Sequence, residues 1–163
     1  MKKKWTTRPY RYGDEEGILS LFSSNVKESG FRNRNREWWQ SHYKQNPAGD
    51  AIIWVAEAGN EIVAHQSWVP KKLKPFSQTI IAGRSGDSRT KADYRRQGIF
   101  RELLLKGHET AMKKGWSLFI GLPNENSHLG LIKSGWLDVC MIPKLVKILR
   151  PGRVSKAIRK KRE

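Results

Sequence analysis

The sequence contains a single cysteine, Cys140, and no long run of apolar residues. One cysteine can form neither an intrachain disulfide nor the cysteine cluster that binds structural zinc. No apolar stretch approaches the roughly 20 residues that span a bilayer. The charged first residues also lack the apolar segment of a secretory signal. These absences lead us to expect a cytoplasmic protein with no membrane span and no bound metal.

Acidic residues are scarce as well, because 15 Asp and Glu stand against 32 Lys and Arg, for a formal net charge of +17. Residues 147–163 hold eight of the basic side chains and one glutamate, so most of the excess lies elsewhere in the chain. Such a field attracts nucleic acid, anionic lipid or a phosphorylated small molecule. It is equally consistent with a basic protein that has no specific anionic partner.

Seven tryptophans among 163 residues indicate a folded domain, since disordered chains are usually poor in aromatic residues. Apolar periodicity and turn residues predict strands over residues 6–12, 51–58, 61–69, 79–90, 117–122 and within 136–149. Helices are predicted over 13–30, 35–45, 98–114 and 127–134, the first with Asp14 as its N-cap. This order predicts an α/β domain over residues 1–150 with a mixed sheet, and a basic tail over 151–163.

The most informative segment is residues 90–100, TKADYRRQGIF, between a predicted strand and the most regular predicted helix. Gly98 would let the backbone approach a ligand closely. The free N–H groups of the helix's first turn and the helix dipole favour a diphosphate there. Arg95 and Arg96 would add charge-assisted hydrogen bonds. The alternative is an ordinary strand-to-helix turn with solvated arginines.

With this context the sequence resembles the GNAT superfamily, whose acetyl-CoA motif is Q/R-x-x-G-x-G/A after a strand. Arg95 and Gly98 match that motif. Downstream, Lys133-Ser134-Gly135-Trp136 stands where the family often has Lys-x-Gly-Phe. The two motifs come in the expected order, and the resemblance extends from the first predicted strand to about Leu149.

The resemblance implies a GNAT-like, mostly antiparallel sheet with a splayed strand pair, helices on both faces, and acetyl-CoA between the splayed strands. The residues it implies in binding acetyl-CoA are Thr90, Arg95, Arg96, Gln97, Gly98, Ile99, Phe100 and Asn124. The amine would attack the thioester directly, with a backbone N–H near Thr90 as the expected oxyanion donor. The implied function is that of an N-acetyltransferase, with acetyl-CoA as co-substrate and no metal.

Two positions depart from the family's pattern. Phe100 stands where the motif ends in a small residue, so its ring must turn into the core. Leu131 stands four residues before Gly135, where many members have the tyrosine that protonates the departing thiolate. The usual general acid is therefore missing or replaced, which leaves open a catalytically silent CoA-binding module.

Asp87 and His128 are the candidate catalytic residues. Asp87 is the only carboxylate in the strand before the motif, and a partly dry cleft can raise the pKa of a carboxyl group, so it is our candidate base. His128 lies near the position of the missing tyrosine and could act as acid or base. The alternatives are a surface Asp87 paired with Arg84 or Arg89, and a solvated His128 at a helix start.

Three aromatic residues of the second predicted helix, Trp38, Trp39 and Tyr43, are candidates to line an acceptor pocket, with Trp68 as a further one. The alternative for each is packing in the core. They favour a small-molecule amine, such as an amino sugar, as the acceptor. A basic nucleic-acid-binding protein is the rival from another class, but no DNA- or RNA-binding motif supports it.

The end of the chain is short for the family. Residues 136–149 suffice for one strand, whereas GNAT domains usually close with two. The tail beyond Gly152 holds only three apolar residues, too few to anchor a helix. We therefore expect an open sheet edge, which a second copy of the chain in a homodimer, or a partner segment, would cover.

Overall fold

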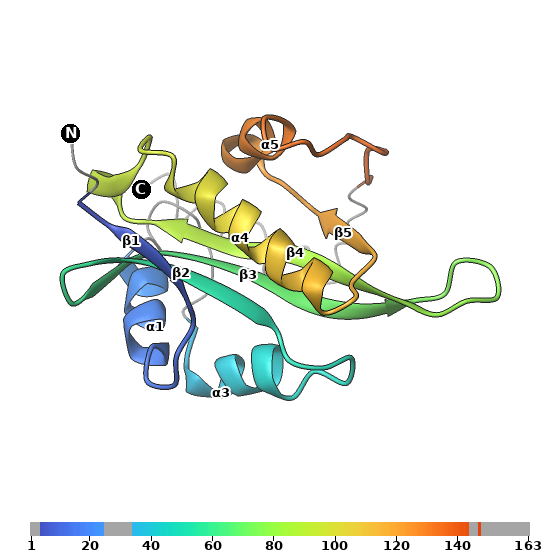
Figure 1. The fold of residues 1–163 in the computed structure, drawn as a ribbon, viewed down its shortest axis with the longest axis horizontal. Helices are drawn as coiled ribbons and strands as arrows, with labels where there is room; N and C mark the ends of the chain where they lie inside the picture. Colours follow the sequence, from blue (N-terminus) through green and yellow to red (C-terminus); the bar gives the residue numbers. More distant parts are fainter. Residues whose placement is uncertain (1–3, 25–33, 144–146, 148–163) are drawn as a thin grey trace.

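Five strands form one sheet in the order β1-β2-β3-β4-β5. They are β1 (Thr6–Pro9), β2 (Ile52–Ala58), β3 (Glu61–Leu73), β4 (Ile80–Thr90) and β5 (Leu118–Gly121). The strands β1 to β4 pair antiparallel and β5 pairs parallel to β4, so the predicted mixed, mostly antiparallel sheet is confirmed. Figure 1 shows this computed structural model, which describes residues 4–24, 34–143 and 147.

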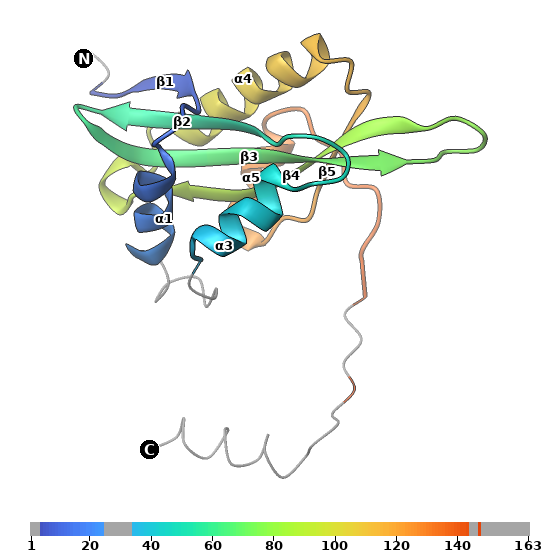
Figure 2. The same ribbon diagram turned by 90° about the horizontal axis from the view of Figure 1, so that it is seen from below.

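Helices cover both faces of the sheet, as Figures 1 and 2 show. On one face lie α1 (Glu15–Ser24) and α3 (Arg36–Trp39), which continues as the π-helical turn η1 (Gln40–Lys44). The opposite face is covered by α4 (Ile99–Lys113). A 3-10 turn, η2 (Ala92–Tyr94), joins β4 to α4, and α5 (Glu125–Ile132) follows β5. No helix in the described ranges is both long enough and apolar enough to cross a bilayer.

Alternation along the central strands places apolar side chains on both faces. Val55 of β2 packs with Tyr43 in the core between the sheet and the α1–α3 layer. Its neighbour Ala56 points the other way and packs with Leu103 of α4. Both faces of the central strands are therefore buried, which explains why these strands are rich in apolar residues.

The predicted helix over residues 35–45 is present but changes type after Trp39. Asn35 is its N-cap, because its side chain accepts a hydrogen bond from the backbone N–H of Trp38 at 2.9 Å. The second half is a π-helical turn, in which Gln45 N–H bonds to the Gln40 carbonyl.

The structure adds detail to three of the predicted elements. Asp14 stands at the N-cap position of α1, because its carbonyl accepts the Ile18 N–H at 3.0 Å, while its carboxylate pairs with Arg8 and accepts the N–H of Arg11. The strand β5 is only partly buried, since it lies at the edge of the described sheet. No strand forms over residues 136–143, the described start of the expected last strand. Most of that strand's remainder and the tail over 151–163 lie outside the described residues.

The strands β4 and β5 separate after a short ladder. Their pairing ends at Ser85 and Gly121, while β4 continues beyond it. Past that point, no described strand lies along this edge of β4. On the other edge, the register with β3 shifts between His65 and Ser67, where Asp87 has a φ of 59°. A β-bulge therefore lies where the two strands part.

Candidate active site

A cleft of about 1310 Å³ opens where β4 and β5 separate. One wall is formed by residues 85–90 of β4, and the facing wall by residues 121–124 and α5. The first turn of α4 also borders it. The cleft thus joins an unpaired strand edge to the start of a long helix.

The loop before α4 adopts a conformation suited to binding an anion. Gly98 is the N-cap with a φ of 83° and no side-chain cap, and Arg96 has a φ of 60°. The first bond of the helix runs from the Glu102 N–H to the Gly98 carbonyl, so the three N–H groups between them have no intrahelical acceptor. With Arg95 and Arg96 beside them in the cleft, these groups form a positive site.

Seven of the eight residues predicted to bind acetyl-CoA line the cleft: Thr90, Arg95, Arg96, Gly98, Ile99, Phe100 and Asn124. Gln97 is not among the lining residues. Its side-chain carbonyl accepts the indole N–H of Trp5 at 3.1 Å, and its amide donates to the Asp93 carbonyl at 2.9 Å. Gln97 therefore fixes the loop in place, while the binding roles of the other seven stay a prediction.

The two departures from the family's pattern lie together at the cleft. Phe100 packs against the core, as expected from its size, and an added Cβ at Gly130 of α5 would lie 2.8 Å from its ring. Leu131 is 6% exposed and lines the cleft, so an apolar side chain occupies the position of the expected tyrosine. Asn124 caps α5, because its side chain accepts the Ser127 N–H at 3.1 Å.

Asp87 lines the cleft and belongs to a buried polar network. One carboxylate oxygen, Oδ1, accepts a hydrogen bond from Arg34 at 2.5 Å. The other, Oδ2, lies 3.1 Å from His42 Nε2 and accepts the Tyr43 hydroxyl hydrogen bond at 3.1 Å. The side chain of Asp87 is 9% exposed. The alternative of an exposed surface aspartate is therefore wrong.

The expected rise in the pKa of Asp87 is also wrong. Burial by itself would raise this pKa, but the hydrogen bond with His42 and the charge of Arg34 outweigh burial and hold it well below its usual range. Asp87 is therefore a carboxylate at neutral pH and a weak base. It can accept hydrogen bonds and orient a polar group without keeping a proton.

The aromatic candidates for the acceptor pocket lie in the core or beside it. Trp39 and Tyr43 are 1% and 0% exposed. Trp38 stacks on His42 with ring centroids 4.6 Å apart, and Trp68 is fully buried. None of the four aromatic candidates is among the residues that line the cleft. Trp39 and Tyr43 stand four positions apart, so they share one face of the helix. That face packs against the core on the sheet.

His128 is exposed on α5 and is not among the lining residues of the cleft. Its Nε2 lies 2.9 Å from Oδ1 of Asp138. This pairing gives no support to a role for His128 in proton transfer at the cleft.

Sequence reasoning missed three buried polar residues in the middle of β3: His65, Gln66 and Ser67. In a strand with one face in contact with water, polar residues alternate with apolar ones. Three consecutive polar residues cannot all face water, because successive side chains point to opposite faces. The run of three polar residues inside an apolar strand was therefore a signal of a buried hydrogen-bonded site.

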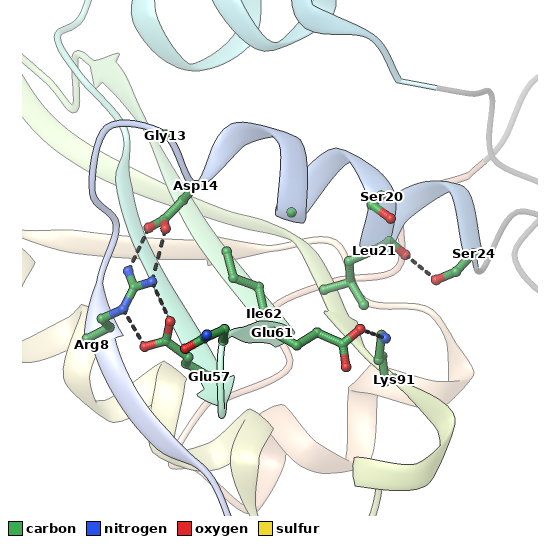
Figure 3. A pocket seen from close by; sticks show the side chains of 12 residues that line it. Arg8, Gly13, Asp14, Ser20, Leu21, Ser24, Glu57, Glu61, Ile62 and Lys91 are labelled. Carbon is green, nitrogen blue, oxygen red and sulfur yellow. Dashed lines mark hydrogen bonds and ion pairs between the residues drawn. The ribbon is translucent and has the colours of Figure 1, made fainter.

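A smaller cavity of about 310 Å³ lies between α1 and the β2–β3 turn (Figure 3). Arg8 pairs there with both Asp14 and Glu57, and Lys91 pairs with Glu61. Because each of these charged groups already has a partner, we assign no ligand to the cavity. Within the described parts of the chain, no group of three or more His, Cys, Asp or Glu side chains is arranged to hold a metal ion.

Comparisons with known proteins agree with this geometry. No curated protein sequence matches the chain. A predicted acetyltransferase from Clostridium acetobutylicum, solved with acetyl-CoA, is 17% identical with a TM-score of 0.72, over 87% of this chain and 96% of that one. Glucosamine-6-phosphate N-acetyltransferase from Arabidopsis thaliana is 14% identical with a TM-score of 0.68, over 91% and 100%. An aminoglycoside acetyltransferase from an uncultured soil metagenomic sample, in complex with sisomicin, is 16% identical with a TM-score of 0.67, over 90% and 97%.

At these identities the solved structures show a shared fold. The family model for the acetyltransferase (GNAT) domain matches residues 6–131, which include the whole described sheet and every lining residue of the cleft except Lys133. This match covers well over half of the chain. The chain therefore belongs to the GNAT acetyltransferase family.

Proposed function

We propose that this protein is an acetyl-CoA-dependent N-acetyltransferase that binds acetyl-CoA in the cleft between β4 and β5. The observation that supports this most is the meeting of two backbone features, since the unpaired edge of β4 and the N-terminus of α4 border one cleft. A free strand edge offers N–H and C=O groups to an extended chain. A helix N-terminus favours a phosphate. Acetyl-CoA combines an extended amide-containing arm with a diphosphate.

The side chains of the cleft fit the same ligand. Arg95 and Arg96 stand at the end of the cleft where α4 begins, and would form charge-assisted hydrogen bonds with the diphosphate. Leu122 and Leu129 line the wall opposite β4 and would contact the apolar parts of the arm. The Clostridium protein of the same fold was solved with acetyl-CoA.

Acetyl-CoA, when bound, supplies an acetyl group activated as a thioester. The chain must then orient the amine, provide a path for its proton and stabilise the carbonyl oxygen as negative charge develops there. Backbone N–H groups near Thr90, on the cleft edge of β4, are the candidates for the last task. Asp87 would accept a hydrogen bond from the attacking amine, or from a water that carries its proton away.

The acceptor in this proposal is a small-molecule amine, in the class of amino sugars. Two proteins of the same fold bear the names of a glucosamine-6-phosphate N-acetyltransferase and an aminoglycoside acetyltransferase, and the second was solved with sisomicin. The Asp87 carboxylate at the cleft would attract the positive charge of such an amine. A panel of amino sugars, aminoglycosides and simple amines, assayed for release of CoA, would identify the class.

Gly98→Trp tests the location of the acetyl-CoA site, with Gly115→Trp as its control. The two glycines border the two ends of α4, have φ values of 83° and 77°, and would each place a Cβ in open space. Both variants should therefore lose similar stability, on the order of 1–3 kcal/mol. Only Gly98→Trp should abolish the binding of acetyl-CoA measured by calorimetry. Equal binding by the two folded variants would put the site elsewhere.

A CoA-binding module without turnover is the second candidate, because Leu131 removes the usual proton donor from the cleft. It would bind acetyl-CoA yet release no CoA with any amine of the panel. A nucleic-acid-binding role, suggested only by the charge of +17, predicts instead an affinity for nucleic acid that falls steeply between low and physiological salt.

A homodimer and a cytoplasmic location belong to the same proposal. β5 ends the described sheet, and Leu137, Val139 and Met141, which follow in the chain, are 86%, 92% and 96% exposed. Exposed apolar side chains and an unpaired edge of the described sheet both favour association with a second copy. Light scattering at several concentrations tests the homodimer, and a strict monomer would contradict it.

Cytoplasmic enzymes seldom depend on disulfides, which fits the single cysteine.

A further inference from the structure

The buried polar residues of β3 have no place in the mechanism above. His65, Gln66 and Ser67 are 1%, 0% and 0% exposed, and apolar residues flank them on both sides along the strand. Burying three polar side chains in a sheet costs free energy unless each finds hydrogen-bond partners. Their partners therefore show what this run of residues accomplishes.

Two of the three side chains bind the backbone of the β4 bulge. The Ser67 hydroxyl donates to the Gly86 carbonyl at 3.0 Å. His65 Nδ1 lies 3.0 Å from the Asp87 carbonyl, and because a carbonyl can only accept, Nδ1 carries the hydrogen. Two successive peptide groups of β4 are thus held by side chains of β3.

The third side chain spans the bulge. The Gln66 amide donates to the Ser85 hydroxyl at 2.9 Å, and the Gln66 carbonyl oxygen accepts a hydrogen bond from the Ser88 hydroxyl. Ser85 is the last residue of β4 that pairs with β5, and Ser88 is the second residue of the bulge. All four residues from 85 to 88 therefore have a hydrogen bond to the run 65–67, which we call the β3 clamp.

The conformation that the β3 clamp holds is unfavourable in isolation. Asp87 has a φ of 59°, which residues with a side chain rarely adopt, although aspartate tolerates it better than most. Such a conformation persists where the surroundings fix it. The Tyr43 hydroxyl strengthens the arrangement, because it lies 3.1 Å from both Ser67 Oγ and Asp87 Oδ2.

We propose that the β3 clamp is a positioning device for the acetyl thioester. It holds residues 85–88 in the bulged conformation, so that the backbone donors of β4 beyond the last β5 pair face the thioester carbonyl. This inference rests on the proposed function, since it assumes acetyl-CoA in the cleft. His65, Gln66 and Ser67 do not line the cleft and act through β4, so they are positioning residues.

Isotope-edited infrared spectroscopy of the full chain with acetyl-CoA labelled with carbon-13 at the acetyl carbonyl tests the proposal without an acceptor. A hydrogen bond to that carbonyl lowers its stretching frequency relative to the free ligand. We expect a lowered frequency in the parent protein and a return most of the way to the solution frequency in Ser67→Ala and Gln66→Leu. Calorimetry should show that both variants still bind acetyl-CoA, because the diphosphate site lies apart from the clamp.

Val55→Ala is the matched control, since Val55 is fully buried in β2 and belongs to the core on the α1–α3 face. It should lower stability and leave the carbonyl frequency of the bound ligand at the parent value. A parent frequency retained in the folded clamp variants, or the same shift in Val55→Ala, would overturn the proposal. Failure of the parent to bind acetyl-CoA would instead overturn the proposed function, and the clamp proposal with it. If Gln66→Leu fails to fold, the milder Ser67→Ala still decides the question.

Discussion

The two halves of β4 differ in what lies along their edges. Residues 80–85 pair with β3 on one edge, and residues 82–85 pair with β5 on the other. Residues 86, 89 and 90 pair with β3 alone, residues 87 and 88 form the bulge, and all five border the cleft. In the first half, Ala82 is buried and Gly83 lies beneath the ring of Trp116. In the second half, residues 87–90 are all polar. The comparison shows that the candidate site arises where one neighbour of a continuous strand ends.

The halves also differ in what fixes them. The first half has strand partners on both edges and close ring packing above it. The second half depends on the β3 clamp and on the network of Asp87 with Arg34 and Tyr43. Because buried polar contacts fix the second half, removing one of its polar side chains should have larger consequences than a small change of shape there.

Removing the Asp87 side chain should have the largest effect on stability. Asp87→Ala deprives Arg34 of its carboxylate partner and leaves alanine, which tolerates positive φ poorly, at a φ of 59°. We expect a loss of about 4 kcal/mol in the free energy of unfolding, measured by urea titration. Asp87→Asn keeps a residue that tolerates this conformation and should lose less. Equal losses in the two variants would show that the backbone conformation contributes nothing.

Acid should lower the free energy of unfolding through His65, which is hydrogen-bonded to the second half of β4. Burial lowers the pKa of His65 to about 4, against an ordinary value of 6.5 and despite its hydrogen bond with the Asp87 carbonyl. The unfolded chain therefore binds a proton first as the pH falls, and stability is lost from pH 6.5 downward until about pH 4. One pKa unit corresponds to 1.36 kcal/mol, so the loss from this residue is about 3 kcal/mol.

Urea titrations near neutral pH and near the lower pKa measure this loss. His65→Gln removes the titrating ring, so its stability should fall less with pH than that of the parent. His108, whose pKa is lowered by burial, contributes the same acid sensitivity to both proteins and cancels in the difference, whereas the pKa of Asp87 is held well below its usual range and this group stays charged over the interval. An identical pH dependence in parent and variant would exclude His65 as the cause.

Features encoded locally in the sequence were predictable. The turn before α4, with Gly98 as its N-cap, follows from a strand signal, a glycine and a regular apolar period over a short window. The β2–β3 hairpin follows from the two-residue gap between the strands predicted over 51–58 and 61–69, and the register confirms it, because Ala58 pairs with Glu61. Each depends on residues close together in the chain.

The surroundings of Asp87 could not be predicted in the same way. Its partners Arg34, His42 and Tyr43 stand 53, 45 and 44 positions earlier in the chain, and only the packing of α3 and η1 on the sheet brings them together. The expected rise in its pKa depended on burial alone, whereas the hydrogen bond with His42 and the charge of Arg34 reverse the direction. The burial of Trp39 likewise depends on which helix face meets the sheet.

Gly83→Ala and Gly86→Ala compare the two halves of β4 directly, with the smallest expected effects. A Cβ at residue 83 would lie 2.9 Å from the Trp116 ring and 3.0 Å from the Phe119 ring. At residue 86 the nearest atom is Arg84 Nη1 at 3.0 Å, the far end of a flexible side chain. Neither glycine has a positive φ, so these contacts decide the outcome.

We expect Gly83→Ala to destabilise the protein by about 2 kcal/mol, because two packed rings must move. Gly86→Ala should stay within about 0.5 kcal/mol of the parent, because Arg84 can shift. Binding of acetyl-CoA should show the reverse order, since Gly86 lines the cleft and Gly83 is not among its lining residues. Urea titration and calorimetry on the same two variants measure both quantities. If Gly86→Ala lowers stability as much as Gly83→Ala, the cleft half of β4 is packed as tightly as the paired half, and the distinction between them is wrong.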